Sequence, residues 1–118
     1  LLHRGTICFS ALEQGLLTNK YIDGIPDDSR AKNKFLHFLT PADVTDDVVS
    51  SLKKLDVIAK SRGQSIAQMA LAWVVRDPRM TSTLIGVRTL NQLYENLKTL
   101  DHLEFAPEEL EEIEYALK

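Results

Sequence analysis

Two short apolar runs frame a long irregular segment and a pair of amphipathic stretches in this chain. Residues 5–10 and 81–87 are rich in β-branched or apolar side chains that do not alternate with charged ones, which is typical of strands buried on both faces. Glycine, asparagine and proline punctuate residues 11–39, so a long loop with room for a helical turn is predicted there. Loops of that length are usually functional or disordered, and the Leu, Tyr and Phe content of this one favours a packed, functional loop.

Four stretches have the periodicity of amphipathic helices, and each begins at a residue suited to a helix start. The starts are Thr45, Ser65 and Thr89 as N-caps and Pro107 at the first helical position. The first helix is expected to run through Arg62 with Gly63 at its C-cap, and the second to end at Asp77-Pro78. The predicted apolar stripes are Val48, Leu52, Leu55 and Ala59; Ile66, Met69, Ala70 and Trp73; Leu90, Leu93, Leu97 and Leu100; and Leu110, Ile113 and Leu117.

The predicted order is strand, long loop, two helices, strand and two helices. Strands joined through helices indicate an α/β fold with a right-handed parallel crossover. Nothing within residues 1–118 marks an internal domain boundary, so one unit is expected. Two parallel strands do not form a stable sheet by themselves, because parallel sheets need cover on both faces and leave unpaired edges. The sequence therefore predicts part of a larger sheet or barrel, or a chain that covers its edges by self-association.

Composition narrows the class of protein. The chain has 118 residues and a formal net charge of −3, which argues against nucleic-acid binding because such proteins usually carry a basic face. The glutamates from Glu108 to Glu114 are expected to form a solvated helix face. The lone Cys8 allows no internal disulfide and is expected to be a buried strand residue. No stretch approaches the ~20 apolar residues of a membrane span and no signal peptide is recognisable, so a cytoplasmic location is expected.

The segment after the second strand has the residues for an anion site. Gly86 closes the strand and Thr89 starts a helix, whose free N–H groups and positive dipole end suit a phosphate. Arg88 adds a permanently charged fork for bidentate contacts. Three polar residues share the next helix face, where an amide and a carboxylate could read the edge and exocyclic amine of an adenine; they are Gln92, Glu95 and Asn96. Spacing alone leaves open an ordinary polar helix surface.

The loop after the first strand offers complementary groups. Lys20, Arg30 and the backbone of residues 10–12 could contact a pyrophosphate, and Phe9 could present its flat face to an aromatic ring. Core packing for Phe9 and solvent exposure for Lys20 remain open alternatives, because aromatic residues are usually buried and lysines usually exposed.

Both segments also carry extended motifs. Residues 9–21 read Phe-Ser-Ala-Leu-Glu-Gln-Gly-Leu-Leu-Thr-Asn-Lys-Tyr, residues 24–30 read Gly-Ile-Pro-Asp-Asp-Ser-Arg, and residues 85–96 read Ile-Gly-Val-Arg-Thr-Leu-Asn-Gln-Leu-Tyr-Glu-Asn. With the helix over 67–74, they resemble the loops after strands 7 and 8 of the aldo-keto reductase superfamily, nearest to the branch with bacterial glyceraldehyde-3-phosphate-type reductases and potassium-channel β subunits. Ala11 stands where that family commonly has proline, and Asn19 where it has glycine; asparagine tolerates left-handed backbone better than most residues.

The resemblance implies an α/β fold that is the C-terminal portion of a (β/α)8 TIM barrel, comprising strands 7 and 8 with their flanking helices. It implies NADP(H) as cofactor, with Phe9 stacked on the nicotinamide, the rest of the first loop along the pyrophosphate and ribose, and the second segment around the 2′-phosphate and adenine. The implied cofactor-binding residues are Phe9, Ser10, Ala11, Leu12, Gln14, Gly15, Lys20, Arg30, Gly86, Arg88, Gln92, Glu95 and Asn96.

In that family the catalytic Asp, Tyr, Lys and His come from earlier strands, so neither a catalytic residue nor a metal is expected here. Lys20 and Tyr21 belong to the cofactor loop, and His3, His37 and His102 are expected at the surface. Reduction of an aldehyde or ketone is implied for a complete barrel, and this chain by itself is expected to be inactive. The alternatives are a non-catalytic binding module that self-associates through exposed strand edges, and an unrelated flavodoxin-like unit, which no Gly-x-Gly-x-x-Gly motif supports.

Overall fold

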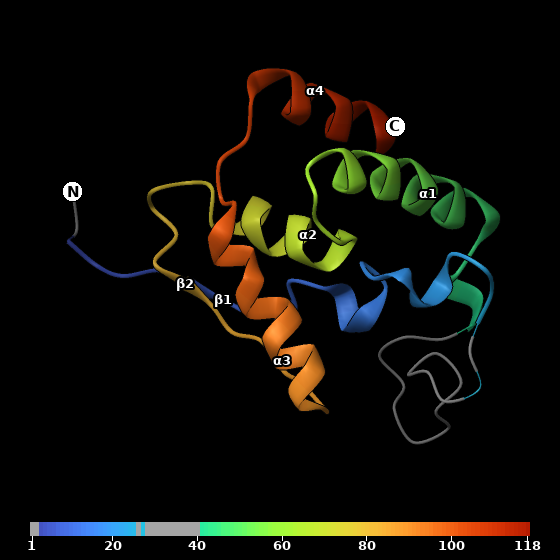
Figure 1. Ribbon diagram of the computed structural model, residues 1–118, viewed down its shortest axis with the longest axis horizontal. Coiled ribbons are helices and arrows are strands. Elements are labelled where there is room, and N and C mark those ends of the chain that lie inside the picture. The colour runs from blue at the N-terminus through green and yellow to red at the C-terminus, as the bar shows by residue number, and fades with distance from the viewer. Residues whose placement is uncertain (1–2, 26, 28–40) are drawn as a thin grey trace.

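The computed structural model describes residues 3–25, 27 and 41–118 of the chain. Within that range, two short strands, β1 (Ile7–Cys8) and β2 (Ser82–Thr83), lie beside the helices α1 (Asp46–Ser61), α2 (Ile66–Val74), α3 (Leu90–Leu97) and α4 (Pro107–Ala116). In Figure 1, α2 lies at the centre, with α1 and α4 next to each other on one side and α3 and the strands on the other. Short 3-10 helices occupy Glu13–Gly15 (η1), Asn19–Tyr21 (η2), Pro41–Asp43 (η4) and Lys98–Asp101 (η5).

The order of elements and the parallel pairing of the two strands confirm the sequence prediction. Ile7 is paired with Ser82 and Cys8 with Thr83, and the amide of Leu84 donates to the carbonyl of Cys8 at 2.8 Å. The thiol of Cys8 is half-buried and lies 3.2 Å from the hydroxyl oxygen of Thr83, within hydrogen-bond distance. Cys8 is therefore a structural residue of the strand pair.

The length and burial of the strands differ from expectation. Pairing covers two residues in each strand, so the predicted strands over 5–10 and 81–87 are too long. Burial on both faces is also wrong, because Ile7 is 63% and Leu84 56% exposed. In the described part of the chain each strand has a single neighbour, so its outer edge and much of its side-chain surface meet solvent.

The predicted helix starts are confirmed. The hydroxyls of Thr45, Ser65 and Thr89 each accept a hydrogen bond at 3.2 Å from the main-chain N–H three residues further on. Pro107 occupies the first turn of α4. Gly63 follows α1 with a φ of +70°, the left-handed conformation that glycine adopts without strain.

The core lies between α1, α2 and α4. Its buried side chains are Leu55, Ile58, Ala59, Ile66, Met69, Ile113 and Ala116. A second cluster joins Tyr21 of η2 to Leu52 of α1, and Tyr21 has no exposed surface. The loop after β1 is thus anchored on α1, as its content of large apolar residues predicts.

Parts of the predicted apolar stripes are wrong. On α2, Trp73 is 37% exposed, and the buried set also includes Gln68, Leu71 and Ala72. Leu90, Leu97 and Leu100 of the stripe predicted for α3 are exposed, whereas Asn96 and Thr99 are buried. Leu117 is also exposed. The side of α3 that carries Asn96 faces α2, and no described element covers the leucines.

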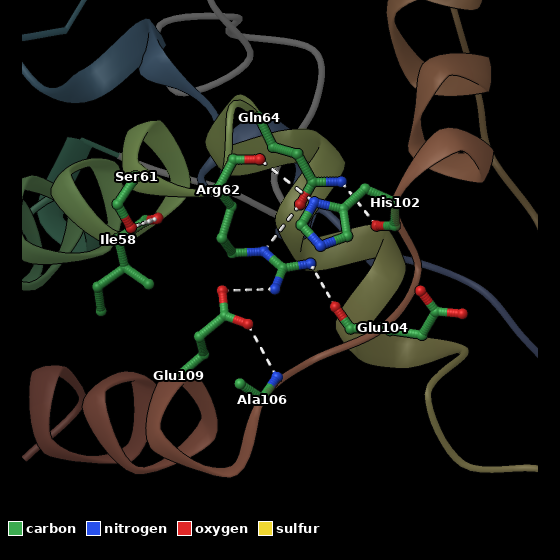
Figure 2. Close-up of polar contacts among 8 residues, drawn as sticks. All are labelled: Ile58, Ser61, Arg62, Gln64, His102, Glu104, Ala106 and Glu109. Atoms are coloured by element: carbon green, nitrogen blue, oxygen red, sulfur yellow. Dashed lines mark hydrogen bonds and ion pairs between the residues drawn. The ribbon is translucent and has the colours of Figure 1, made fainter.

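Arg62, directly after α1, ties three segments together (Figure 2). Its guanidinium donates to Gln64 Oε1 at 3.0 Å, to Glu109 Oε2 at 2.7 Å and to the carbonyl oxygen of Glu104 at 3.0 Å. Its charged end also lies 3.8 Å from the centre of the Phe105 ring, and the side chain is 1% exposed. Glu109 therefore departs from the expected solvated acidic face, because it is the ionic partner of a buried arginine.

His102 also departs from its expected surface role. Its Nδ1 lies 3.2 Å from the main-chain oxygen of Arg62, and the residue is half-buried. His3 is exposed, as expected, and His37 lies outside the described residues. No helix in the described part of the chain is long and apolar enough to cross a membrane.

Candidate functional site

A cavity of about 610 Å³ opens between the loop after β1, the segment after β2 and α3. The parallel pairing of β1 with β2 brings the ends of both strands, and hence both loops, to the same edge. Eleven residues expected from the motifs line this cavity: Phe9, Ser10, Ala11, Leu12, Gly15, Lys20, Gly86, Arg88, Gln92, Glu95 and Asn96. Of the other two, Gln14 lies in η1 and Arg30 lies outside the described residues.

The loop after β1 turns sharply as it enters the cavity wall. Ser10 and Glu13 have φ values of 59° and 46°, and Gly15 has 97°. The carbonyl of Ser10 accepts from the amide of Glu13 at 3.0 Å, and that of Leu12 from Gly15 at 2.9 Å. Non-glycine residues in the left-handed region cost about 1–3 kcal/mol each and cluster at functional sites. The turn therefore stores strain at the position where the motif begins.

Thr18 holds the second half of the same loop and also lines the cavity. Its hydroxyl donates to the carbonyl of Gly15 at 2.5 Å and accepts from the amide of Lys20 at 3.3 Å. This residue was not predicted from the sequence, although a threonine hydroxyl that accepts from the main-chain N–H two residues further on forms a common type of turn. Phe9 lies at the other end of the loop and is 79% exposed, so the core-packing alternative is wrong for it in this structure.

The start of α3 forms the second wall. The side-chain Oε1 of Gln92 accepts from the main-chain N–H of Arg88 at 2.7 Å. The main-chain N–H of Gln92 donates to the Thr89 hydroxyl. Among the described residues the amides of Leu90 and Asn91 have no acceptor, as usual for the first turn of a helix. Asn91 lines the cavity and was missed by the sequence argument.

Two cations and an open glycine border this helix start. Arg88 and Lys20 line the cavity, are exposed, and have no carboxylate partner within the described residues. A Cβ added to Gly86 would meet no atom of the described residues within 4 Å, so packing within that part of the chain does not require glycine there. The space beside Gly86 is therefore open to a ligand that approaches the backbone closely.

Glu95 and Asn96 occupy the far end of the wall. Asn96 is 8% exposed and lines the cavity, and its side chain has no hydrogen-bond partner among the described residues. Glu95 has both carboxylate oxygens engaged, with Oε1 at 3.0 Å from Lys98 Nζ and Oε2 at 3.3 Å from Gln68 Nε2. Because no described residue pairs with it, the side-chain amide of Asn96 is available to a ligand in the cavity.

The chemistry that these walls support is anion and ring binding rather than proton transfer. The two cations and the two main-chain N–H groups that lack partners within the described residues favour phosphate groups. Apolar side chains also line the cavity, namely Ala67 of α2 and Leu84 and Ile85 after β2. The sequence predicts Leu84 and Ile85 only as buried strand residues. No group of three or more His, Cys, Asp or Glu residues that could hold a metal occurs within residues 3–25, 27 and 41–118.

Comparison with known proteins identifies relatives over nearly the whole chain. A family model described as Aldo/keto reductase family matches residues 4–118. The L-glyceraldehyde 3-phosphate reductase of Escherichia coli (strain K12) is 46% identical over 112 residues, covering 93% of this chain and 32% of that protein. The probable voltage-gated potassium channel subunit beta of Oryza sativa subsp. japonica is 37% identical over 112 residues, covering 93% and 34%. The chain thus spans about a third of the length of the curated relatives it matches.

Proposed function

This chain belongs to the aldo/keto reductase family, and from that premise we propose that its two loops form the NADP(H)-binding part of a carbonyl reductase. The observation that carries the proposal is the shared cavity, around which both motif segments lie. We place β1 and β2 as the seventh and eighth strands of a (β/α)8 barrel, whose phosphate sites commonly follow those two strands.

The start of α3 is the proposed site of the 2′-phosphate. Arg88 offers a planar fork that suits bidentate contact with a phosphate, and it has no competing carboxylate among the described residues. The amides of Leu90 and Asn91 add donors at the positive end of the helix dipole. Gly86 leaves the approach open.

The remaining cavity residues are assigned to the adenine and nicotinamide ends of the dinucleotide. The side-chain amide of Asn96 has no partner among the described residues and would hydrogen-bond to an adenine edge, and Gln92 keeps its NH₂ group for the ligand because its oxygen is held by Arg88. Phe9, which lines the cavity and is 79% exposed, is the proposed stacking surface for the nicotinamide. Lys20 and the backbone of Ser10 and Leu12 are assigned to the pyrophosphate between them.

When bound, the dinucleotide supplies the hydride that reduces the carbonyl carbon of an aldehyde or ketone. The residues of this chain bind and orient it, and the proposed proton donor lies outside the chain. Lys20 is left to the phosphates and Tyr21 is fully buried under the loop, so neither is assigned a proton-transfer role. We therefore expect the 118-residue chain alone to turn over no carbonyl substrate, and we retain the cytoplasm as its proposed location.

A second candidate function is a non-catalytic interaction module, and the exposed apolar surface favours it. Leu90, Tyr94, Leu97 and Leu100 are between 48% and 69% exposed on and just after α3, and Ile7 is exposed on β1. Apolar patches of this kind commonly mark interaction surfaces. Sedimentation velocity at increasing protein concentration tests this candidate: a rising sedimentation coefficient supports self-association, and a constant monomer removes it.

The first candidate is tested by isothermal titration calorimetry of the chain with NADPH and with NADH. We expect weak but saturable binding that is tighter for NADPH, and no loss of NADPH absorbance when an aldehyde is added. Equal binding of both dinucleotides, or none, would contradict the assignment of the cavity to a 2′-phosphorylated cofactor. Turnover of the aldehyde would contradict the placement of the proton donor outside the chain.

A further inference from the structure

Gln68, near the start of α2, is a buried residue that reaches across to α3. It is 6% exposed, and its neighbour Ala67 lines the cavity. Its side-chain oxygen accepts from the amide of Ser65 at 3.0 Å, which completes a capping box at the start of α2. The motif comparison assigns Gln68 no role, because its place in the apolar helix over 67–74 indicates only packing.

The other half of the same amide binds Glu95. Nε2 donates to the main-chain oxygen of Glu95 at 2.8 Å and lies 3.3 Å from its Oε2. The orientation of the Gln68 amide was assigned from these partners. The N–H of Ser65 needs an acceptor, and the main-chain oxygen and Oε2 of Glu95 need a donor. One side chain therefore caps the start of α2 and satisfies a carbonyl in the last turn of α3, where intrahelical donors run out.

The contact also restrains a charge beside the cavity. Lys98 holds one carboxylate oxygen of Glu95 and Gln68 holds the other. A carboxylate free to turn toward the cavity would oppose an anionic ligand near Arg88, because like charges repel. Asn96, the next residue, belongs to the same turn of α3 and also lines the cavity.

We propose that Gln68 is a positioning residue of the cavity: its amide fixes the carboxylate of Glu95 and the last turn of α3, and thereby favours a 2′-phosphorylated dinucleotide over an unphosphorylated one. The identity of the ligand rests on the proposed function, whereas the restraint on Glu95 rests on the contacts alone. Gln68 acts through Glu95 and is not assigned a contact with the dinucleotide.

Gln68→Glu keeps the hydrogen-bond acceptor of this side chain and removes its donor. Glutamate keeps an oxygen for the Ser65 amide and is itself a preferred capping-box residue, so the start of α2 is preserved. It replaces the donor to Glu95 with an oxygen, which faces a carbonyl and a carboxylate. Glu95→Gln in the same chain restores a donor–acceptor pair between the two side chains with the direction reversed.

The test is a calorimetric titration of the four chains (wild type, Gln68→Glu, Glu95→Gln and the double variant) with NADPH and NADH. We expect the ratio of NADPH to NADH affinity to fall about tenfold in Gln68→Glu, the effect of one hydrogen bond to a charged group. It should recover in part in the double variant, which restores the side-chain contact but not the hydrogen bond to the main-chain oxygen of residue 95. Ile113→Val, which trims a buried side chain of α4, is the matched control for lost stability and should leave the ratio unchanged. A ratio within about twofold of wild type in Gln68→Glu, the scatter of independent sites, would overturn the proposal while leaving the proposed function intact.

Urea unfolding of the same four chains decides the positioning role even if no dinucleotide binds, an outcome that would defeat the proposed function by itself. We expect the two substitutions to be coupled by at least about fivefold in the unfolding constant, as for residues in direct contact. Strict additivity would show that Gln68 does not hold Glu95, and would sink the inference whatever the titrations give.

Discussion

Replacing Glu109 by glutamine tests how α4 is held to the rest of the molecule. Its carboxylate accepts from Arg62 Nη1 at 2.7 Å through one oxygen and from the amide of Ala106 at 2.8 Å through the other (Figure 2). Partial burial by itself raises the pKa of Glu109, but the hydrogen bonds from Ala106 and Arg62 and the positive charge of Arg62 outweigh it, so the pKa lies below its ordinary value. The folded state therefore favours the charged form.

The expected loss can be worked out from the exposure of the two partners. Removing one partner of a fully buried ion pair costs about 3–5 kcal/mol, because the remaining charge stays desolvated. The Arg62 side chain is 1% exposed, but that of Glu109 is 26% exposed, and glutamine keeps an acceptor for Ala106 or Arg62. We therefore expect Glu109→Gln to lower the free energy of unfolding by about 2–3 kcal/mol and the Tm by roughly 10 °C.

Urea denaturation followed by circular dichroism, with thermal melts, measures this loss. Glu112→Gln is the matched control, because it removes the same charge from an exposed position of α4 and should change stability by less than about 0.5 kcal/mol. A loss in Glu109→Gln no larger than in the control would refute the reasoning that Arg62 is a buried charge dependent on Glu109.

Three further predictions concern the cavity and the response to acid. Arg88→Ala should weaken NADPH binding roughly 10- to 100-fold in calorimetry and leave NADH binding nearly unaffected, because hydrogen bonds to charged groups contribute about 1.5–3 kcal/mol. Lys53→Ala, which removes another exposed cation, is the control. Equal losses for both dinucleotides would contradict the assignment of Arg88 to the 2′-phosphate. Gly86→Ala should not lower the urea midpoint, since its Cβ would meet no atom of the described residues within 4 Å, yet it should weaken NADPH binding. Unchanged affinity would place the ligand elsewhere. Because the folded-state pKa of Glu109 is lowered, its contribution is complete above the ordinary value of 4.5 and is lost as the pH falls through the lower folded value. Urea midpoints of wild type and Glu109→Gln should therefore converge on acidification, and a constant difference would contradict the pKa shift.

Much of the local structure was predictable because it depends on neighbours in sequence. Thr45, Ser65 and Thr89 cap helices by bonding to amides three residues away, so their roles can be read without a fold. The α/β order and the parallel pairing followed from periodicity. The motifs likewise selected residues that lie around one cavity, although nothing in the pattern indicated that Asn96 would be a buried residue.

The burial of particular faces was not predictable, because periodicity finds a stripe without saying what covers it. Leu90 and Leu97 form a regular stripe on α3 yet are exposed, since the described part of the chain packs α3 through the side that carries Asn96. Ile7 of β1 and Leu84, which directly follows β2, are also exposed, because each strand has one neighbour in the described part of the chain. A hydrophobic pattern shows which side chains can be buried, but whether they are buried depends on the element that packs against them.

Sequence by itself determined the family motifs, the helix starts and the order of elements. Tertiary structure alone decided that Arg62 meets Glu109, 47 residues away, and that Gln68 meets Glu95, 27 residues away. An arginine after a helix and a glutamine within one look like ordinary polar residues until the fold removes their water and supplies specific partners. Each such contact depends on which segments the core brings together, and a polar group acquires a defined role only where burial makes an unmet hydrogen bond costly.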